Sequence, residues 1–124
     1  MLTVTKQFKF DAAHYLPYYI GACHNLHGHT YHLDVTVTGD VISNTKHEKC
    51  GMIIDFKDLK SIVQEKVLKG YDHSYLNDFY INPTAETLAE CIGTDISEAL
   101  PEGVRLVRIR LWEGDESYVE YTPD

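Results

Sequence analysis

Histidines gather between Cys23 and His32, and their spacing could hold a metal ion. His27 and His29 are two residues apart at the start of an alternating segment, so in a strand both imidazoles project to the same side. His14 ends an earlier strand-like segment and could supply a third nitrogen if the two strands pair. Three imidazoles with an open fourth position are typical of catalytic zinc rather than structural zinc. No Cys-x-x-Cys pair is present to close such a site.

The other histidines offer alternatives. A single histidine at a strand end is usually exposed or satisfied by a neighbour, so the prediction depends on the three taken together. By spacing, His24 and His32 could serve as ligands instead. His32 lies on the parity opposite to the apolar row and His24 falls in a loop, so we interpret both as surface residues or neighbours of the ligands. We interpret His47 as a loop residue.

Three cysteines form an odd set without the spacing of a disulfide framework, which favours free thiols in a reducing cytosol. Cys23 lies four residues before His27, close enough to share its pocket. A thiol near a dication deprotonates readily, which suits a nucleophile or a general base. A buried apolar cysteine is the alternative interpretation, and we prefer it for Cys91. Nothing around Cys50 demands a role.

Two acidic positions further along the chain could also carry chemistry. Asp72 directly precedes His73, and a carboxylate beside a histidine can set its tautomer or favour its charged form. Glu113 shares the parity of an apolar row, Val107, Ile109 and Leu111. A carboxylate on such a row either ends the strand or anchors a ligand.

Alternating and helical spacing predicts the elements that position these residues. Strands are expected over residues 3–14, 30–38, 104–113 and 118–121, with side chains alternating between two faces. A helix should begin after Asp55 as N-cap and close at Gly70 as the C′ residue. A second helix should begin after Thr84 and bury a stripe of Leu88, Ile92, Ile96 and Leu100 (or Ala99). The order ββααββ implies one α+β domain over residues 1–124, an antiparallel sheet with two helices on one face.

Composition excludes several classes of protein. Apolar residues make up 44% of the 124 residues, as in globular proteins. The net charge of −8 argues against nucleic-acid binding, which needs clustered Lys and Arg. No segment approaches the ~20 apolar residues of a membrane span. The N-terminus lacks the layout of a signal peptide, so we expect a cytoplasmic protein.

Six segments together resemble the 6-pyruvoyltetrahydropterin synthase and 6-carboxytetrahydropterin synthase family over nearly the whole chain. They are residues 10–14 (FDAAH), 23–31 (CHNLHGHTY), 51–56 (GMIIDF), 72–77 (DHSYLN), 82–86 (NPTAE) and 112–113 (WE). Each is modest by itself, whereas six in the family's order are specific.

The resemblance implies the tunnelling fold (T-fold) and a homohexamer of two stacked trimers, with active sites between subunits. By the same resemblance, Zn²⁺ is held by His14, His27 and His29. Cys23 matches the family's catalytic cysteine, and Asp72 with His73 match its proton-transfer pair. Glu113 matches the glutamate that anchors the amino-pyrimidine edge of the pterin, an edge whose two N–H groups suit a carboxylate.

The spacing Cys-x3-His-Gly-His resembles the bacterial 6-carboxytetrahydropterin synthases. The substrate would be 7,8-dihydroneopterin triphosphate, and the products 6-carboxy-5,6,7,8-tetrahydropterin, acetaldehyde and triphosphate. This step feeds 7-deazaguanine and hence queuosine synthesis for tRNA modification. One alternative is a 6-pyruvoyltetrahydropterin synthase, which keeps the side chain. Another is a non-catalytic zinc- or pterin-binding protein.

The basic residues that would hold the triphosphate stay open. By strand parity the candidates are Lys6, Lys9, Arg105, Arg108 and Arg110. Solvated charges at a sheet edge are an equally good interpretation of these residues. Helix capping is sufficient to explain Asp55, Thr84 and Glu86, although the resemblance allows the last two a contact with the ligand.

Overall fold

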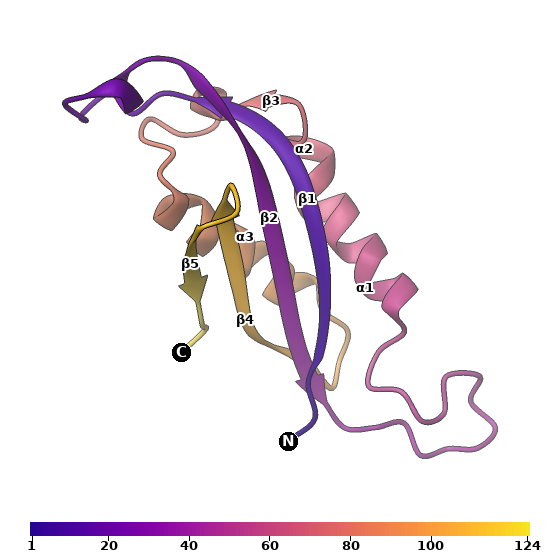
Figure 1. Ribbon diagram of the computed structural model, residues 1–124. Coiled ribbons are helices and arrows are strands. Elements are labelled where there is room, and N and C mark those ends of the chain that lie inside the picture. Colours follow the sequence, from indigo (N-terminus) through magenta and orange to yellow (C-terminus); the bar gives the residue numbers. More distant parts are fainter.

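A computed structural model describes residues 1–124 and has two layers, a sheet and the helices that cover one of its faces (Figure 1). The sheet has five strands in the order β3-β1-β2-β4-β5. Their bounds are β1 Val4–His14, β2 His27–Gly39, β3 Ser74–Tyr75, β4 Val104–Glu113 and β5 Ser117–Tyr121. The expected α+β arrangement is therefore confirmed. None of the helices combines the length and the hydrophobicity that a membrane crossing requires.

The long antiparallel pair β1–β2 forms the centre of the sheet. Its register runs from Val4 opposite Val37 to His14 opposite His27. Alternation sends one row of each strand towards the helices, and these side chains are buried: Phe10, Ala12, His14, Tyr31, Leu33, Val35 and Val37. The other row faces away from the helices. The alternation of polar and apolar residues in the sequence therefore correctly predicts which face of the sheet the helices cover.

A bulge in β4 changes one part of the expected apolar row. Thr36 pairs with Arg108 and Val37 with Leu106, which leaves Val107 as an extra residue. Leu106 is 2% exposed and lies in the core, whereas Val107 is only half-buried. The prediction that Val107 shares the row of Glu113 is wrong, because an extra residue inverts the parity beyond it.

The first helical rod begins where the sequence predicts. Its parts are α1 Phe56–Val63, a π-helical segment η2 Gln64–Leu68 and α2 Lys69–Tyr71. The Asp55 side chain caps α1 by accepting a hydrogen bond from the backbone N–H of Lys57 at 2.8 Å. The prediction that Gly70 closes the helix is wrong. The rod continues to Tyr71, whose buried ring stacks against Phe10 at 6.0 Å, so a core contact outweighs the glycine signal.

The second helix, α3, spans Ala85–Ala99 and packs on β4 and β5. Thr84 is its N-cap, as predicted, and its side chain accepts from the backbone N–H of Thr87 at 3.2 Å. Leu88, Ile92 and Ile96 of the predicted stripe are buried, whereas Ala99 and Leu100 at the end of the helix are only half-buried. A short helix-like turn, η3 Leu76–Asp78, connects the two helical regions.

One strand lies outside the predicted antiparallel pattern. The two-residue β3 follows His73 and pairs with β1 in parallel, with Ala12 opposite Ser74 and Ala13 opposite Tyr75. Two residues are too few to give an alternating signal. This short strand matters for the site, because it holds the segment around residue 72 against β1.

Gly93 on α3 permits the close approach of β5. A Cβ atom placed on Gly93 would overlap the ring of Tyr121. We therefore expect Gly93→Ala to lower the free energy of unfolding by about 1–3 kcal/mol, the usual cost of overpacking. Gly70→Ala is the matched control, because its Cβ would meet no atom within 4 Å. Urea denaturation should show a lower midpoint for Gly93→Ala only, and equal midpoints would contradict this packing.

Candidate metal centre and adjoining pocket

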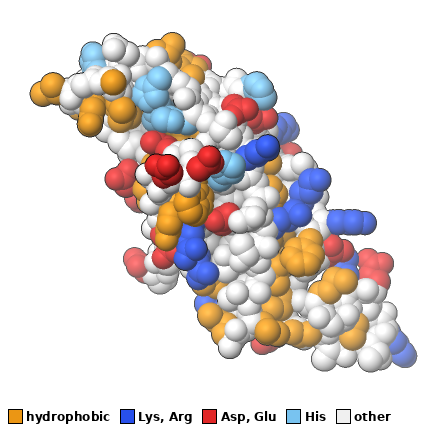
Figure 2. All heavy atoms as spheres, in the orientation of Figure 1, with side chains coloured by type: hydrophobic (Ala, Val, Ile, Leu, Met, Phe, Trp, Pro, Cys, Tyr) orange, Lys and Arg blue, Asp and Glu red, His pale blue; other side chains and the backbone are white.

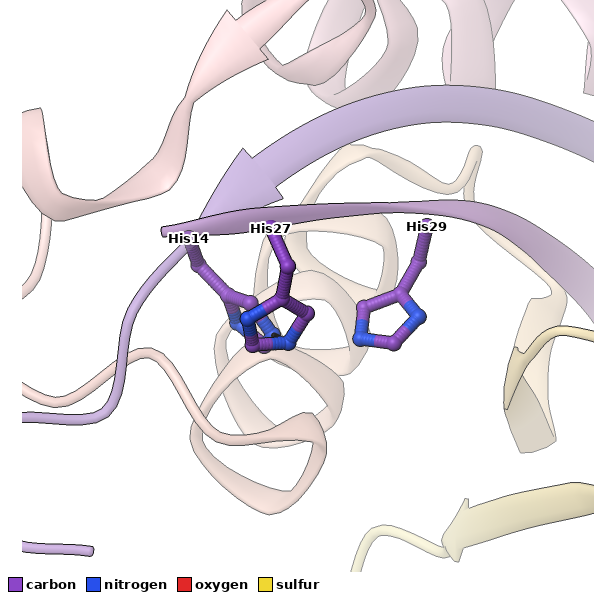
Figure 3. Close-up of side chains that lie close together, drawn as sticks. All are labelled: His14, His27 and His29. Atoms are coloured by element: carbon purple, nitrogen blue, oxygen red, sulfur yellow. Dashed lines mark hydrogen bonds between the residues drawn. The ribbon is translucent and has the colours of Figure 1, made fainter. Parts of the chain in front are cut away.

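Three histidines converge where β1 ends and β2 begins (Figure 3). His14 is the last residue of β1 and pairs with His27, the first residue of β2. His29 lies two residues further on and shares their face. One ring nitrogen from each of the three lies within 4.8 Å of the others. Strand pairing thus brings together the three residues that the sequence singled out.

Hydrogen bonds fix the tautomers of two of these rings. His14 Nδ1 lies 2.8 Å from the carbonyl oxygen of Pro83, and His27 Nδ1 lies 2.7 Å from that of Asn25. A carbonyl oxygen only accepts hydrogen bonds, so each Nδ1 carries a proton, and Nε2 is the nitrogen that can bind a metal. With Nδ1 protonated, the neutral form of each ring has its lone pair on Nε2. The two Nε2 atoms face each other at 3.1 Å.

Two facing lone pairs need a cation between or beside them. Burial lowers the pKa of His14, whose side chain is 1% exposed, and this favours its neutral form over protonation. Two nitrogen ligands on a tetrahedral zinc ion lie about 3.3 Å apart, given Zn–N bonds of about 2.0–2.1 Å. The observed separation therefore fits two nitrogen ligands of one zinc ion, which His14, His27 and His29 would hold.

A cavity of about 380 Å³ adjoins this cluster. Glu113 lines it, and the Glu113 carboxylate lies 3.8 Å from His29 Nε2. The cavity wall comes from the β1–β2 loop, the start of α3 and strands β4 and β5, and includes Leu16, Tyr19, Thr84, Glu86, Leu111 and Val119. A flat ring with one polar edge suits a pocket whose lining is mostly apolar and includes the Glu113 carboxylate.

Cys23 lies near the site in the chain but outside the group of three histidines. It occupies the short 3-10 turn η1 Ala22–His24, and its side chain is half-buried. Its carbonyl accepts a hydrogen bond from the backbone N–H of Leu16 at 2.9 Å, which closes the loop between β1 and β2. The backbone of Cys23 is thus fixed in the loop that joins the strands carrying His14 and His27.

Asp72 and His73 form a second cluster together with Asp11. Asp72 Oδ1 lies 3.1 Å from His73 Nδ1 and accepts from the backbone N–H of Asp11 at 3.0 Å. The hydrogen bond from Asp11, followed by the contact with His73, holds the pKa of the Asp72 carboxyl below its usual range. His73 has a φ of 60° and donates its backbone N–H to the carbonyl of Asp11 at 2.6 Å.

The Asp72–His73 pair and the histidine cluster lie on opposite faces of the sheet. Asp11 alternates with the inward-facing Ala12 and is exposed, and Thr30 donates to its carboxylate across the outer face. The three histidines project from the inner face. Within one chain, the structure therefore does not bring Asp72 and His73 to the metal centre.

The remaining candidates lie away from the three histidines. His32 faces outwards and lies 3.4 Å from Asp115, and His47 accepts from the backbone of Lys49 in a loop. Arg108 and Arg110 both pair with Glu120, at 3.8 and 2.7 Å. Neither arginine lines the cavity beside Glu113. The interpretation as solvated surface charge accounts for the two arginines.

Sequence reasoning missed three contacts at this site. The Pro83 carbonyl that orients His14 and the Asp11 backbone N–H that binds Asp72 are main-chain groups, which no residue pattern reveals. Tyr31 belongs by parity to the apolar row of β2, yet its hydroxyl lies 3.4 Å from His14 Nδ1. Its parity with His29 was the one available signal.

Comparison with known proteins agrees with this geometry. Residues 3–124 match the family model described as 6-pyruvoyl tetrahydropterin synthase. The chain is 35% identical to 6-carboxy-5,6,7,8-tetrahydropterin synthase of Haemophilus influenzae, over 98% of this chain and 99% of the relative. It is 42% identical to dihydroneopterin monophosphate aldolase of Pyrococcus furiosus, over 90% of this chain and 89% of that protein.

A solved structure of Caenorhabditis elegans 6-pyruvoyl tetrahydropterin synthase superposes with a TM-score of 0.83. It is 24% identical, and the match covers 99% of this chain and 96% of the other. At that identity the likeness shows the fold, a T-fold subunit.

Proposed function

The chain belongs to the 6-pyruvoyl tetrahydropterin synthase family of pterin-processing lyases, and from this we propose that it is a zinc-dependent 6-carboxytetrahydropterin synthase. The substrate is 7,8-dihydroneopterin triphosphate, and the products are 6-carboxy-5,6,7,8-tetrahydropterin, acetaldehyde and triphosphate. The observation that carries the proposal is the facing pair of Nε2 atoms in a cluster of three imidazoles, beside a pocket that Glu113 lines.

The pocket supports a pterin as the bound group. Glu113 presents a carboxylate that can accept two parallel N–H bonds from the amino-pyrimidine edge. Leu111 and Val119 supply apolar surface for the ring. With Glu113 only 3.8 Å from His29, a ring anchored there directs its side chain towards the three histidines. The role of Glu113 is therefore positioning of the reacting carbons.

His14, His27 and His29 would hold the zinc ion, which when bound supplies Lewis-acid stabilisation of several kcal/mol to charge that develops on substrate oxygen. Cys23, as a thiolate, removes a proton from the substrate's side chain. His73, oriented by Asp72 at 3.1 Å, transfers the matching proton on the opposite side. Proton transfer by a placed group contributes roughly 10²–10⁴-fold to the rate.

These roles of Cys23 and His73 in one active site require a second copy of the chain. Asp72 and His73 lie on the outer face of the sheet, so they serve a neighbour's histidine cluster rather than their own. Exposed apolar side chains near both sites support assembly: Tyr18, Ile20 and Leu26 in the β1–β2 loop, and Phe79 and Ile81 after η3 (the loop lies at the upper left of Figures 1 and 2). A hexamer of two stacked trimers and a cytoplasmic location complete the proposal.

Product analysis tests the reaction. Zinc-loaded protein incubated with 7,8-dihydroneopterin triphosphate should release acetaldehyde and the carboxypterin in equal amounts. A chelator should stop turnover, and added zinc should restore it. A pyruvoyl product without acetaldehyde would instead identify the elimination reaction that keeps the side chain. Consumption of no pterin at all would overturn the catalytic proposal.

A second candidate is the aldolase reaction on a pterin monophosphate. The 42% identity to the Pyrococcus furiosus enzyme favours it, and the cavity beside Glu113 contains no Lys or Arg within one chain. The cysteine at position 23 favours the synthase instead, because it supplies the base that the synthase reaction needs. Parallel assays with dihydroneopterin monophosphate and triphosphate separate the two, since the ratio of kcat/KM values names the preferred substrate.

A further inference from the structure

Tyr31 occupies the floor of the candidate metal centre. It lies on β2 two residues after His29, on the same face, and is 0% exposed. Its cross-strand neighbours are Phe10 on β1 and Glu113 on β4. Tyr31 thus lies beside the histidines and opposite Glu113 on the neighbouring strand, without lining the pocket itself.

The contacts of Tyr31 fix its ring and direct its hydroxyl to one ligand. Phe10 stacks on the ring with centroids 5.0 Å apart and planes 11° apart. The imidazoles of His14 and His29 meet the same ring edge-on, at 6.3 and 5.6 Å. The hydroxyl oxygen lies 3.4 Å from His14 Nδ1 and has no other hydrogen-bond partner in the chain.

These contacts place two acceptors around a single donor. His14 Nδ1–H is directed mainly to the Pro83 carbonyl at 2.8 Å, and the Tyr31 oxygen receives the weaker part of the bond. Together the two oxygens fix the tautomer and the rotation of the ring. The Nε2 atom on the opposite side then points at His27 Nε2. Partners of this kind, behind a metal ligand, set its orientation and basicity.

We infer that Tyr31 is a positioning residue for the metal centre, whose buried hydroxyl holds the His14 imidazole in the orientation that binds zinc. The inference rests on the proposed function, because it concerns affinity for the zinc ion that the three histidines would share. Tyr31 is not itself a ligand, and its contacts with His14 and His29 are what assign it this role.

Zinc affinity of Tyr31→Phe tests the inference, because this variant keeps the ring and removes only the hydroxyl. Competition with a chromogenic chelator should give a Kd about 10–100-fold weaker than that of the wild type. Cobalt-substituted Tyr31→Phe should also show a changed visible absorption band, which reports ligand geometry directly. Tyr71→Phe is the matched control, since it removes another buried hydroxyl, one bonded to Tyr80 rather than to a histidine.

The outcomes separate the two proposals. Wild-type protein that binds no zinc would contradict the proposed function. Wild-type protein that binds zinc, with Tyr31→Phe within twofold of it or no weaker than Tyr71→Phe, would overturn the role of Tyr31 alone. Thermal unfolding of the metal-free proteins completes the test. A loss of affinity in a Tyr31→Phe protein as stable as Tyr71→Phe supports positioning.

Discussion

Replacing Cys23 by alanine is expected to lower the rate of product formation by about 10²–10⁴-fold, the usual contribution of a placed proton-transfer group. The thiol lies in the η1 turn outside the group of three histidines, so its loss should leave zinc binding unchanged. The measurements are steady-state kinetics with 7,8-dihydroneopterin triphosphate and zinc content by atomic absorption.

Cys50→Ala is the control for that experiment, because Cys50 is also a half-buried loop cysteine but lies near neither cluster. It should retain wild-type kinetics. Cys23→Ala that turns over at the wild-type rate with zinc intact would remove Cys23 from the mechanism. Loss of both zinc and activity would instead make Cys23 a ligand, which the group of three histidines does not predict.

Co-expression of two inactive variants, Cys23→Ala and His73→Ala, should restore activity. If each site combines Cys23 of one chain with His73 of another, random mixing leaves about a quarter of the sites with both residues intact. The expectation follows from the opposite faces that the two clusters occupy in a single chain. Each variant carries its own affinity tag, so that mixed oligomers can be isolated and assayed.

A second mixture serves as the control for complementation. Cys23→Ala with His27→Ala should recover nothing, because both residues belong to the same end of the β1–β2 pair and so to the same chain's half of a site. No recovery in the first mixture would show that the Asp72–His73 pair does not act across chains. Recovery in the second would show instead that Cys23 serves the histidine cluster of another chain.

Much of the fold could be predicted because its signals are local. Alternation located β1, β2, β4 and β5, and the capping residues Asp55 and Thr84 located the starts of both helices. The failures all involve tertiary contacts. Tyr71 reaches the core and carries the rod past Gly70, and the extra residue Val107 is visible only against the register of β2. The parallel strand β3 is too short to have a pattern.

The candidate site, too, could be predicted from local signals only in part. The prediction that His14 lies beside His27 and His29 needed only the pairing of two strands, and the structure places the three together. Proximity of Asp72 to His73 followed from adjacency. The face on which that pair lies did not, because it depends on Asp11 and on β3. The supporting contacts from Pro83 and Tyr31 arise only when the chain is folded.

The facing Nε2 atoms of His14 and His27 also have a consequence for folding thermodynamics. Two lone pairs held 3.1 Å apart repel each other, so the metal-free native state carries a penalty that the unfolded chain escapes. Binding of zinc at a free concentration 100 times Kd raises the stability by about 2.7 kcal/mol, a figure that already includes relief of this repulsion. Protein from which a chelator has removed zinc therefore has a lower melting temperature than the zinc-bound protein. Activity that falls slowly during metal removal then has two causes, loss of the catalytic zinc ion and unfolding of the chain. Circular dichroism distinguishes them, because only unfolding changes the spectrum of the backbone.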